Sequence, residues 1–413
     1  MANEAPLKIL MLCTKFPYPP KDGGTMAMHS MIRGFSKAGH QVTVLTMNTS
    51  KHYVLLRSLP DEILRMASFY AVDVNTDVQF LDALSNLIFS RESYHVIRFT
   101  SQAFKAQLER LLEKNDYDVV QLETLYMAPY IPVIRAMKPK ALISLRTHNI
   151  EYEIWSRRAD NEKNPIKEYY FRETSARIKR YEEDTYAANP FDVVIPITGK
   201  DAGILKNMGV KTPVMVSQAG IEEEDLDTSP VKTTPQSIFY IGSLDWGPNL
   251  EGIEWFLKNV WPRVTKMHPK VKFHLAGRSM PEKYIKLDEE NIVIAGEVES
   301  SGKFIRSKSI MVVPILSGSG MRVKIAEGLA YGKAIVATRI AAEGISVKHG
   351  YDILLADTPE EFANCIAVLI EKESMLTTIG HHAKELWKRE LKNDKIISTL
   401  VDFYRKEVAK KVK

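Results

Sequence analysis

The sequence predicts an α/β fold made of two domains, each with a parallel β-sheet at its centre. The length of 413 residues fits two or three domains of about 150 residues each. Short apolar runs typical of buried strands alternate with longer helical patterns. The alternation restarts after residues 228–235, a Pro-, Ser- and Thr-rich stretch with the composition of a linker. We therefore expect one domain over 1–227 and a second over 235–385.

The first half opens with a βαβ unit. A buried-strand pattern at 7–12 runs into a glycine-containing loop at 17–24, a helix over 25–38 ended by Gly39, and a second strand at 41–46. A strand, a helix and a strand in under fifty residues indicate a parallel sheet. We expect further strands at 118–122, 141–146 and 192–197, and helices over most of 55–112 and over 151–188.

The second half repeats this architecture, again opening with a strand that enters a glycine-containing loop. We expect strands at 237–241, 271–276, 292–295, 310–314 and 334–338, and helices over 249–266 and 321–331.

Composition excludes several classes of protein. Apolar residues make up 45% and charged residues 26% of the chain, as in ordinary globular proteins. The net charge of +5 is too small to indicate a nucleic-acid binder. Residues 384–413 hold ten Lys or Arg and five Asp or Glu. This excess predicts a solvated terminal helix, and weak attraction to an anionic membrane surface is the alternative.

The cysteines and the apolar runs argue against a secreted, zinc-binding or membrane-spanning protein. Cys13 and Cys365 are far apart and form neither a disulfide framework nor a Cys/His cluster. The first residues lack a signal-peptide pattern, and no run of about 18 apolar residues occurs. We expect a cytoplasmic protein, with the inner face of the plasma membrane as a place of peripheral contact.

Residues 314–338 carry the most informative pattern. A strand delivers the loop Gly318-Ser319-Gly320 to a helix expected to begin near Met321, and unpaired N–H groups at a helix start suit a phosphate. Arg322 and Lys324 are expected in the first turn, where cations oppose the helix dipole unless an anion binds. A tight turn with exposed basic residues is the alternative.

This segment resembles the donor-binding signature of retaining GT-B glycosyltransferases of family 4. In that signature a Glu, seven residues and a second Glu precede an Ala- and Gly-containing helix, and Glu327 falls on the second Glu. The resemblance implies two Rossmann-like domains that face each other across a cleft. It also implies that the C-terminal helix, about 386–413, crosses back to the N-terminal domain.

The resemblance assigns roles to individual residues. Glu327 would accept hydrogen bonds from the ribose hydroxyls, and His148, at a strand end, would contact the donor sugar. Glu123 is the acceptor-side residue that we expect. The catalytic set is His148, Arg322, Lys324 and Glu327. The donor-binding set is Gly23, Gly24, Gly242, Ser243, Arg278, Glu297, Val298, Gly318, Ser319, Gly320 and Met321.

The chain departs from the family pattern at three positions. Ser319 replaces the first Glu of the signature, so the donor sugar stays open. Ser243 and Asn249 stand where many relatives have an Arg and a Lys that bind the diphosphate. Because two phosphate charges still need compensation, we expect Arg322, Lys324 and Arg278 to supply it.

The function implied is a retaining, metal-independent hexosyl transfer from a UDP- or GDP-sugar to a glycan or lipid-linked saccharide in cell-envelope polysaccharide synthesis. We expect no cofactor, no metal site and no nucleic-acid partner. A GT-B nucleotide-sugar epimerase and a non-enzymatic two-domain sugar-binding protein are the alternatives. A nicotinamide oxidoreductase is disfavoured because no Gly-x-Gly-x-x-Gly follows the first strand.

Overall fold

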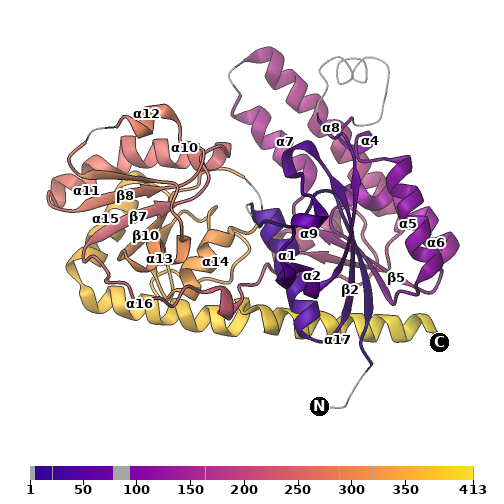
Figure 1. The fold of residues 1–413 in the computed structure, drawn as a ribbon. Coiled ribbons are helices and arrows are strands. Elements are labelled where there is room, and N and C mark those ends of the chain that lie inside the picture. The colour runs from indigo at the N-terminus through magenta and orange to yellow at the C-terminus, as the bar shows by residue number, and fades with distance from the viewer. Residues whose placement is uncertain are drawn as a thin grey trace. The chain divides into compact units, whose positions relative to one another are not determined.

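The computed structural model describes residues 5–20, 22–77, 94–162, 164–287, 289–318 and 320–412. The chain forms two compact units: unit 1 comprises Met1–Ala219 with Ile396–Lys413, and unit 2 comprises Gly220–Lys395. In the described residues, each unit holds a six-stranded parallel sheet covered by helices (Figure 1). The two-domain α/β fold is therefore confirmed.

The sheet of unit 1 has the strand order β3-β2-β1-β4-β5-β6. Every residue of β4 and β5 is buried, as expected for parallel strands covered on both faces. The strands are β1 (Lys8–Cys13), β2 (Gln41–Asn48), β3 (Ser68–Asp73), β4 (Val119–Leu122), β5 (Leu142–Thr147) and β6 (Val193–Pro196). The helices are α1 (Gly23–Lys37), α2 (Asp61–Met66), α4 (Tyr94–Ile97), α5 (Gln102–Lys114), α6 (Ile131–Met137), α7 (Glu151–Asp160), α8 (Pro165–Ala188), α9 (Gly199–Asn207) and most of α17 (Asn393–Val412).

The sheet of unit 2 has the strand order β12-β11-β10-β7-β8-β9. Its strands are β7 (Ser237–Ile241), β8 (Lys272–Ala276), β9 (Ile292–Gly296), β10 (Ile310–Val313), β11 (Ala334–Ala337) and β12 (Leu354–Leu355). Its helices are α10 (Gly247–Trp255), α11 (Trp261–Met267), α12 (Glu282–Ile285), α13 (Ser301–Arg306), α14 (Val323–Ala330), α15 (Pro359–Glu371) and α16 (Glu373–Leu386). The described helices include none that is both long and apolar enough to span a bilayer.

Both units share one topology. Numbered within its own unit, each sheet has the order 3-2-1-4-5-6, read from one edge. The chain reverses direction across the sheet between β1 and β4 in unit 1, and between β7 and β10 in unit 2. Ligands of such sheets bind outside the carboxyl ends of the strands at this reversal. The topology alone therefore predicts one ligand-binding position in each unit, at the carboxyl ends of the strands where the chain reverses.

Helix α17 supplies part of the core of unit 1. Ile397, Leu400, Val401 and Tyr404 of α17 are buried in one apolar cluster with residues of β1 and α1. The C-terminal helix thus packs on the N-terminal unit, as the family resemblance implies.

Several predicted elements differ from the structure. The region 55–112, predicted to be helical, contains the strand β3, an edge strand whose partial exposure hides its pattern; its residues 78–93 lie outside the described part. The predicted helix over 151–188 is two helices, because Asn164 caps a new helix that begins at Pro165. The predicted helix over 249–266 begins at Gly247 and widens into a π-helical turn over Phe256–Val260, just before Pro262.

The division between the units falls at Ala219/Gly220 and Lys395/Ile396 rather than at the predicted boundaries of 227–235 and 385/386. Residues 220–235 bond to unit 2: the Ile221 N–H donates to the Leu391 carbonyl at 3.0 Å, and Arg306 donates to the Asp227 carbonyl at 2.7 Å. Composition marks the loop at 228–235 but not these long-range bonds.

The close approach of α10 to the end of β10 depends on Gly252. A Cβ there would lie 2.3 Å from the Pro314 carbonyl oxygen. We expect Gly252→Ala to lower the free energy of unfolding by about 1–3 kcal/mol through overpacking, measured by urea denaturation. Gly203→Ala in α9, where an added Cβ meets nothing within 4 Å, is the matched control and should be neutral or stabilising. Equal effects of the two substitutions would contradict the proposed packing.

Candidate functional site

Several of the predicted donor-binding residues of unit 2 lie at the carboxyl ends of β7 and β10. Gly242 follows β7, and the glycine loop follows β10. Gly318 and Gly320 have positive φ values, 99° and 79°, which residues with a side chain rarely adopt. Ser319, between them, lies outside the described residues, so its predicted sugar contact stays a prediction.

Lys324 lies at the centre of this site. Its Nζ donates to the Tyr240 hydroxyl at 2.7 Å and to Asn249 Oδ1 at 2.9 Å. A Cβ on Gly242 would come within 2.4 Å of this Nζ, so the glycine makes room for the ammonium. Burial, together with the nearby Arg322, lowers the pKa of Lys324 to about 7. Both hydrogen-bond partners among the described residues are neutral, and the position therefore suits an anionic ligand.

Ser243, Asn249 and Arg278 belong to the same hydrogen-bonded group. Asn249 Nδ2 donates to the Ser243 carbonyl at 2.6 Å, and Arg278 Nε donates to Ser243 Oγ at 3.1 Å. Asn249 thus links the loop after β7 to Lys324. Hydrogen bonds through Ser243 and Asn249 thus connect Arg278 with Lys324. Compensation of the phosphate charges by these cations stays a prediction.

Arg322 holds the glycine loop. Its Nη1 donates to the Gly320 carbonyl at 2.9 Å, and its guanidinium carbon lies 5.3 Å from the centroid of the Trp246 ring. The prediction that Arg322 lies in the first helical turn is wrong: α14 begins at Val323, and Arg322 is the extended residue before it. Met321, also predicted to be helical, precedes the helix and packs against an apolar cluster of unit 2.

Glu327 lies one turn beyond Lys324 on α14. Its Oε1 accepts a hydrogen bond from Ser301 Oγ at 3.0 Å. Burial raises the pKa of Glu327, while Ser301 and Lys324 act in the opposite direction. An i, i+3 pair lies on one helix face, so the carboxylate and the ammonium border the same side of α14.

Glu297 and Val298 follow β9, at the edge of the sheet. Glu297 is exposed and Val298 is half-buried. The Gly277 N–H donates to the Gly296 carbonyl at 2.8 Å, which joins this loop to the one that carries Arg278.

In unit 1 the predicted residues Glu123 and His148 are in direct contact. Glu123 follows β4 and is fully buried, and its Oε2 lies 2.7 Å from Nε2 of His148, which follows β5. Arg146 Nη1 lies 3.4 Å from the same oxygen. Although burial favours protonation, Arg146 and hydrogen bonds from His148 and Gln121 bring the pKa of Glu123 below its ordinary value.

His148 is held by this carboxylate. Burial lowers the pKa of His148, against the opposing effect of Glu123. Since ionised Glu123 can only accept hydrogen bonds, neutral His148 donates through Nε2 and keeps Nδ1 as an acceptor.

Gly23 and Gly24, predicted in a loop, are the first residues of α1. Asp22 caps this helix, because its Oδ1 accepts a hydrogen bond from the Thr25 N–H at 2.9 Å. The same oxygen forms an ion pair with Lys15 Nζ at 2.7 Å. Against the effect of burial, Lys15 lowers the pKa of Asp22 to about 2. A Cβ on Gly24 would lie 3.1 Å from Lys15 Nζ. Gly24 therefore leaves room for the Lys15–Asp22 pair at the helix start.

Sequence reasoning missed Tyr240, Trp246, Ser301 and Arg146. Tyr240 and Arg146 lie within strands, where the sequence pattern predicts a side chain of the core rather than of a site. Ser301 follows Ser300, the N-cap of α13, and this Ser-Ser pair was the one local signal available.

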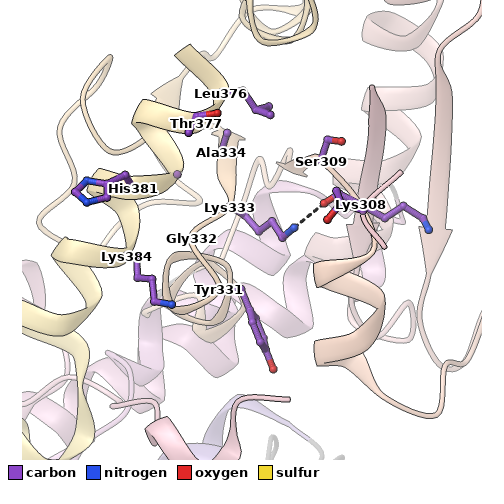
Figure 2. A pocket seen from close by; sticks show the side chains of 12 residues that line it. Lys308, Ser309, Tyr331, Gly332, Lys333, Ala334, Leu376, Thr377, His381 and Lys384 are labelled. Carbon is purple, nitrogen blue, oxygen red and sulfur yellow. Dashed lines mark hydrogen bonds between the residues drawn. The ribbon is translucent and has the colours of Figure 1, made fainter. Parts of the chain in front are cut away.

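A separate hollow of about 370 Å³ opens in unit 2 at the amino ends of β10 and β11 (Figure 2). Figure 2 shows Lys333 at its centre, with a hydrogen bond to a backbone carbonyl. Its lining consists of Thr233, Lys308, Ser309, Tyr331, Gly332, Lys333, Ala334, Leu376, Thr377, Gly380, His381 and Lys384. None of these is a predicted site residue. The hollow lies at the amino ends of the strands, whereas Lys324 lies beyond their carboxyl ends.

Comparisons with known proteins agree with the fold and the site. Residues 235–372 match the family model described as glycosyl transferases group 1. The chain is 23% identical over 410 residues to an uncharacterized 44.6 kDa protein in the cps region of Klebsiella pneumoniae, covering 95% of this chain and 98% of that protein.

Two solved structures show the same architecture. Anabaena HepE in complex with UDP has a TM-score of 0.68 at 14% identity, over 97% of this chain and 100% of that one. Sucrose-phosphate synthase from Thermosynechococcus elongatus has a TM-score of 0.69 at 14% identity, over 97% and 99%. The chain therefore has the two-domain GT-B fold of these structures, and the match of its residues 235–372 to the glycosyl transferases group 1 model indicates a glycosyltransferase domain.

Proposed function

We propose that this protein transfers a hexose, with retention of anomeric configuration and without a metal ion, from a UDP- or GDP-sugar to a glycan or lipid-linked saccharide acceptor. The observation that carries the proposal is the Lys324 ammonium, enclosed against Gly242 and bonded to neutral partners at the ligand-binding position of unit 2. Support comes from HepE, a protein of the same fold that was crystallised with UDP and with UDP-glucose.

The proposed chemistry needs charge stabilisation at the leaving group. As the bond to the sugar breaks, negative charge develops on the departing diphosphate, and fixed donors lower the barrier. Lys324 supplies a buried cation, and Arg278 supplies a second cation through the Ser243 loop. Arg322 fixes the glycine loop, whose N–H groups would face the phosphate. These groups take the place of a metal ion in the proposal.

Retention is compatible with the absence of a dedicated protein base. In the proposed mechanism a phosphate oxygen of the leaving group takes the proton of the acceptor hydroxyl on the same face of the sugar. His148 serves as a positioning group: its Nδ1, left open by the Nε2 contact with Glu123, accepts a hydrogen bond from a hydroxyl group of the sugar. Glu123 itself is fully buried, and we now assign it to holding His148 rather than to the acceptor.

The proposed setting is cell-envelope polysaccharide synthesis, in the cytoplasm at the inner face of the plasma membrane. Two observations support it: the Klebsiella pneumoniae relative lies in a cps region, and residues 384–413 carry ten Lys or Arg against five Asp or Glu. Anionic lipid attracts such segments.

The test incubates the protein with UDP- and GDP-hexoses, with and without saccharide acceptors, and analyses the products by mass spectrometry and NMR. We expect nucleotide release that depends on the acceptor and an unchanged anomeric configuration in the product. A changed sugar nucleotide formed without any acceptor would instead establish the epimerase alternative. Activity that is lost on chelation and restored by a metal ion would contradict metal independence.

Glu327→Ala tests the ribose contact. Loss of a charged hydrogen-bond acceptor should weaken UDP binding about 10- to 100-fold, measured by calorimetry. Wild-type protein should bind UDP more tightly than 2′-deoxy-UDP, and the variant should bind both equally. Ser301→Ala, which removes the partner of Glu327 but keeps the carboxylate, is the control and should retain the preference. A preference that survives in Glu327→Ala would show that the ribose lies elsewhere.

A further inference from the structure

A line of buried polar side chains crosses the otherwise apolar face of the unit 1 sheet that α17 covers. Gln121 and Ser144 are directly opposite each other in the pairing of β4 with β5. Glu123 and Arg146 come two residues later on the same face, because side chains alternate along a strand. All four side chains are fully buried. Apolar residues would fill this space at less cost in desolvation.

Tyr404 of α17 closes this line at the end away from His148. Its side chain is fully buried, and its hydroxyl donates to Gln121 Oε1 at 2.7 Å and lies 2.8 Å from Ser144 Oγ. Since a hydroxyl has one proton to give, Ser144 must donate to Tyr404. The hydrogen bonds therefore run in one direction, from Ser144 through Tyr404 to Gln121.

The Gln121 amide is oriented from both ends, by the Tyr404 hydroxyl that donates to its Oε1 and by the Glu123 carboxylate that accepts from its Nε2. With Oε1 occupied by Tyr404, Nε2 of Gln121 points at Glu123 and donates to its Oε1. Glu123 Oε2 is then left for His148 and Arg146. The reversed amide would place its carbonyl oxygen against the carboxylate, an unfavourable contact between two acceptors.

We propose that Tyr404 is a positioning residue of the transferase, acting through Gln121 and Glu123 to hold His148 with Nε2 engaged and Nδ1 open. The inference rests on the proposed function only for the role of His148; the hydrogen-bonded line itself does not depend on it. By this assignment the C-terminal helix contributes to the chemistry of unit 1 as well as to its packing.

Tyr404→Phe in the full-length protein is the direct test, because it removes the hydroxyl and keeps the buried ring. Histidine signals are followed by NMR in ¹⁵N-labelled protein, with the His148 signals assigned by their loss in His148→Gln. Arg146 and Lys15 are the cations that act on His148, and Glu123 is the anion. In the variant Gln121 Oε1 loses its donor, so the amide is held from one side only and its hydrogen bond to Glu123 weakens. Glu123 becomes more basic as a result, and we expect the pKa of His148 to rise by about 0.5 to 1.

Two further measurements separate positioning from mere structure. Gln121→Met removes the donor to Glu123 itself and should shift His148 at least as far as Tyr404→Phe does, with no further change when the two are combined. Tyr130→Phe removes another buried hydroxyl of unit 1, bonded to Phe99 and Ser101, and should leave His148 unchanged. With a sugar-nucleotide donor, kcat of Tyr404→Phe should fall about tenfold at an unchanged donor KM.

The proposal is overturned if the pKa and tautomer of His148 are the same in Tyr404→Phe as in the wild type, whatever the activity. It is also overturned if Tyr130→Phe shifts His148 as much as Tyr404→Phe does. A shift of His148 in a protein that transfers no sugar would refute the proposed function and leave the positioning role intact.

Discussion

Lys324→Met should reduce sugar transfer at least about a hundredfold, which is the effect of losing one preorganised donor to developing charge. Methionine keeps the length of the side chain beside Gly242 and Tyr240 and removes only the ammonium. Because its hydrogen-bond partners, Tyr240 and Asn249, are neutral, the loss breaks no hydrogen-bonded ion pair. Glu327 keeps its hydrogen bond from Ser301, so the thermal midpoint should change little. Initial rates and calorimetric UDP affinity measure the effect.

Lys333→Met is the matched control for this substitution. Lys333 is also a largely buried lysine of unit 2 bonded to neutral groups, the carbonyls of Arg306 and Lys308, and burial lowers its pKa to about 8. Lys333 lies at the amino ends of the strands, away from Lys324 at their carboxyl ends, so UDP affinity should be unchanged in Lys333→Met. Equal losses in the two variants would show that the Lys324 site has no special role in binding the nucleotide.

The pH dependence of UDP binding gives an independent check on Lys324. A bound diphosphate favours the ammonium form, so a group with a pKa of about 7 takes up a proton on binding, and affinity falls as pH rises from 7 to 9. Without ligand the sign is opposite for stability: the unfolded chain, with its ordinary lysine pKa of 10.5, binds more protons above pH 7, so folding gains stability as pH rises. Both slopes should shrink in Lys324→Met.

Glu123→Leu should lower the free energy of unfolding of unit 1 by about 3–5 kcal/mol, the cost of leaving one partner of a buried ion pair uncompensated. Arg146 has no exposed surface, and its nearest carboxylate oxygen among the described residues is that of Glu123. Denaturant unfolding followed by circular dichroism measures the loss.

The double variant Glu123→Leu/Arg146→Met separates charge from shape. Removing both charges leaves neither unpaired, so most of the lost stability should return. Activity should not return with it, since His148 still lacks its hydrogen-bond partner. A double variant no more stable than Glu123→Leu would show that packing, rather than the stranded guanidinium, causes the loss.

Local patterns were sufficient to predict most of the sheet residues, because a parallel strand buried on both faces is a short apolar run between turns. The edge strand β3 lacks that pattern. The charged residues on both sides of Asn164-Pro165 predict one continuous helix, and the helix cap at this dipeptide was missed. The helix after the glycine loop was predicted to begin two residues too early, since Met321 and Arg322 precede α14 and Arg322 is extended.

The site was only partly predictable. Sequence alone placed Arg278 and His148 after strands and Lys324 in the first turn of a helix, where ligand-facing residues are expected. It could not show that Lys324 bonds to Tyr240, 84 residues away, or that Tyr404 bonds to Gln121, 283 residues away. Pairs at such separations come from topology, and a single sequence does not encode them as a pattern.

The entry and exit of unit 2 are neighbours. Gly220, its first residue, packs so closely on Asn393 that a Cβ would lie 2.7 Å from the Asn393 Cα, and Ile221 bonds to the backbone on both sides of Lys392. The two ends of the segment 220–395 therefore lie next to each other. A segment with adjoining ends can be exchanged whole. Because the proposed function places the donor on unit 2, we expect chimaeras joined at 219/220 and 395/396 to exchange donor preference.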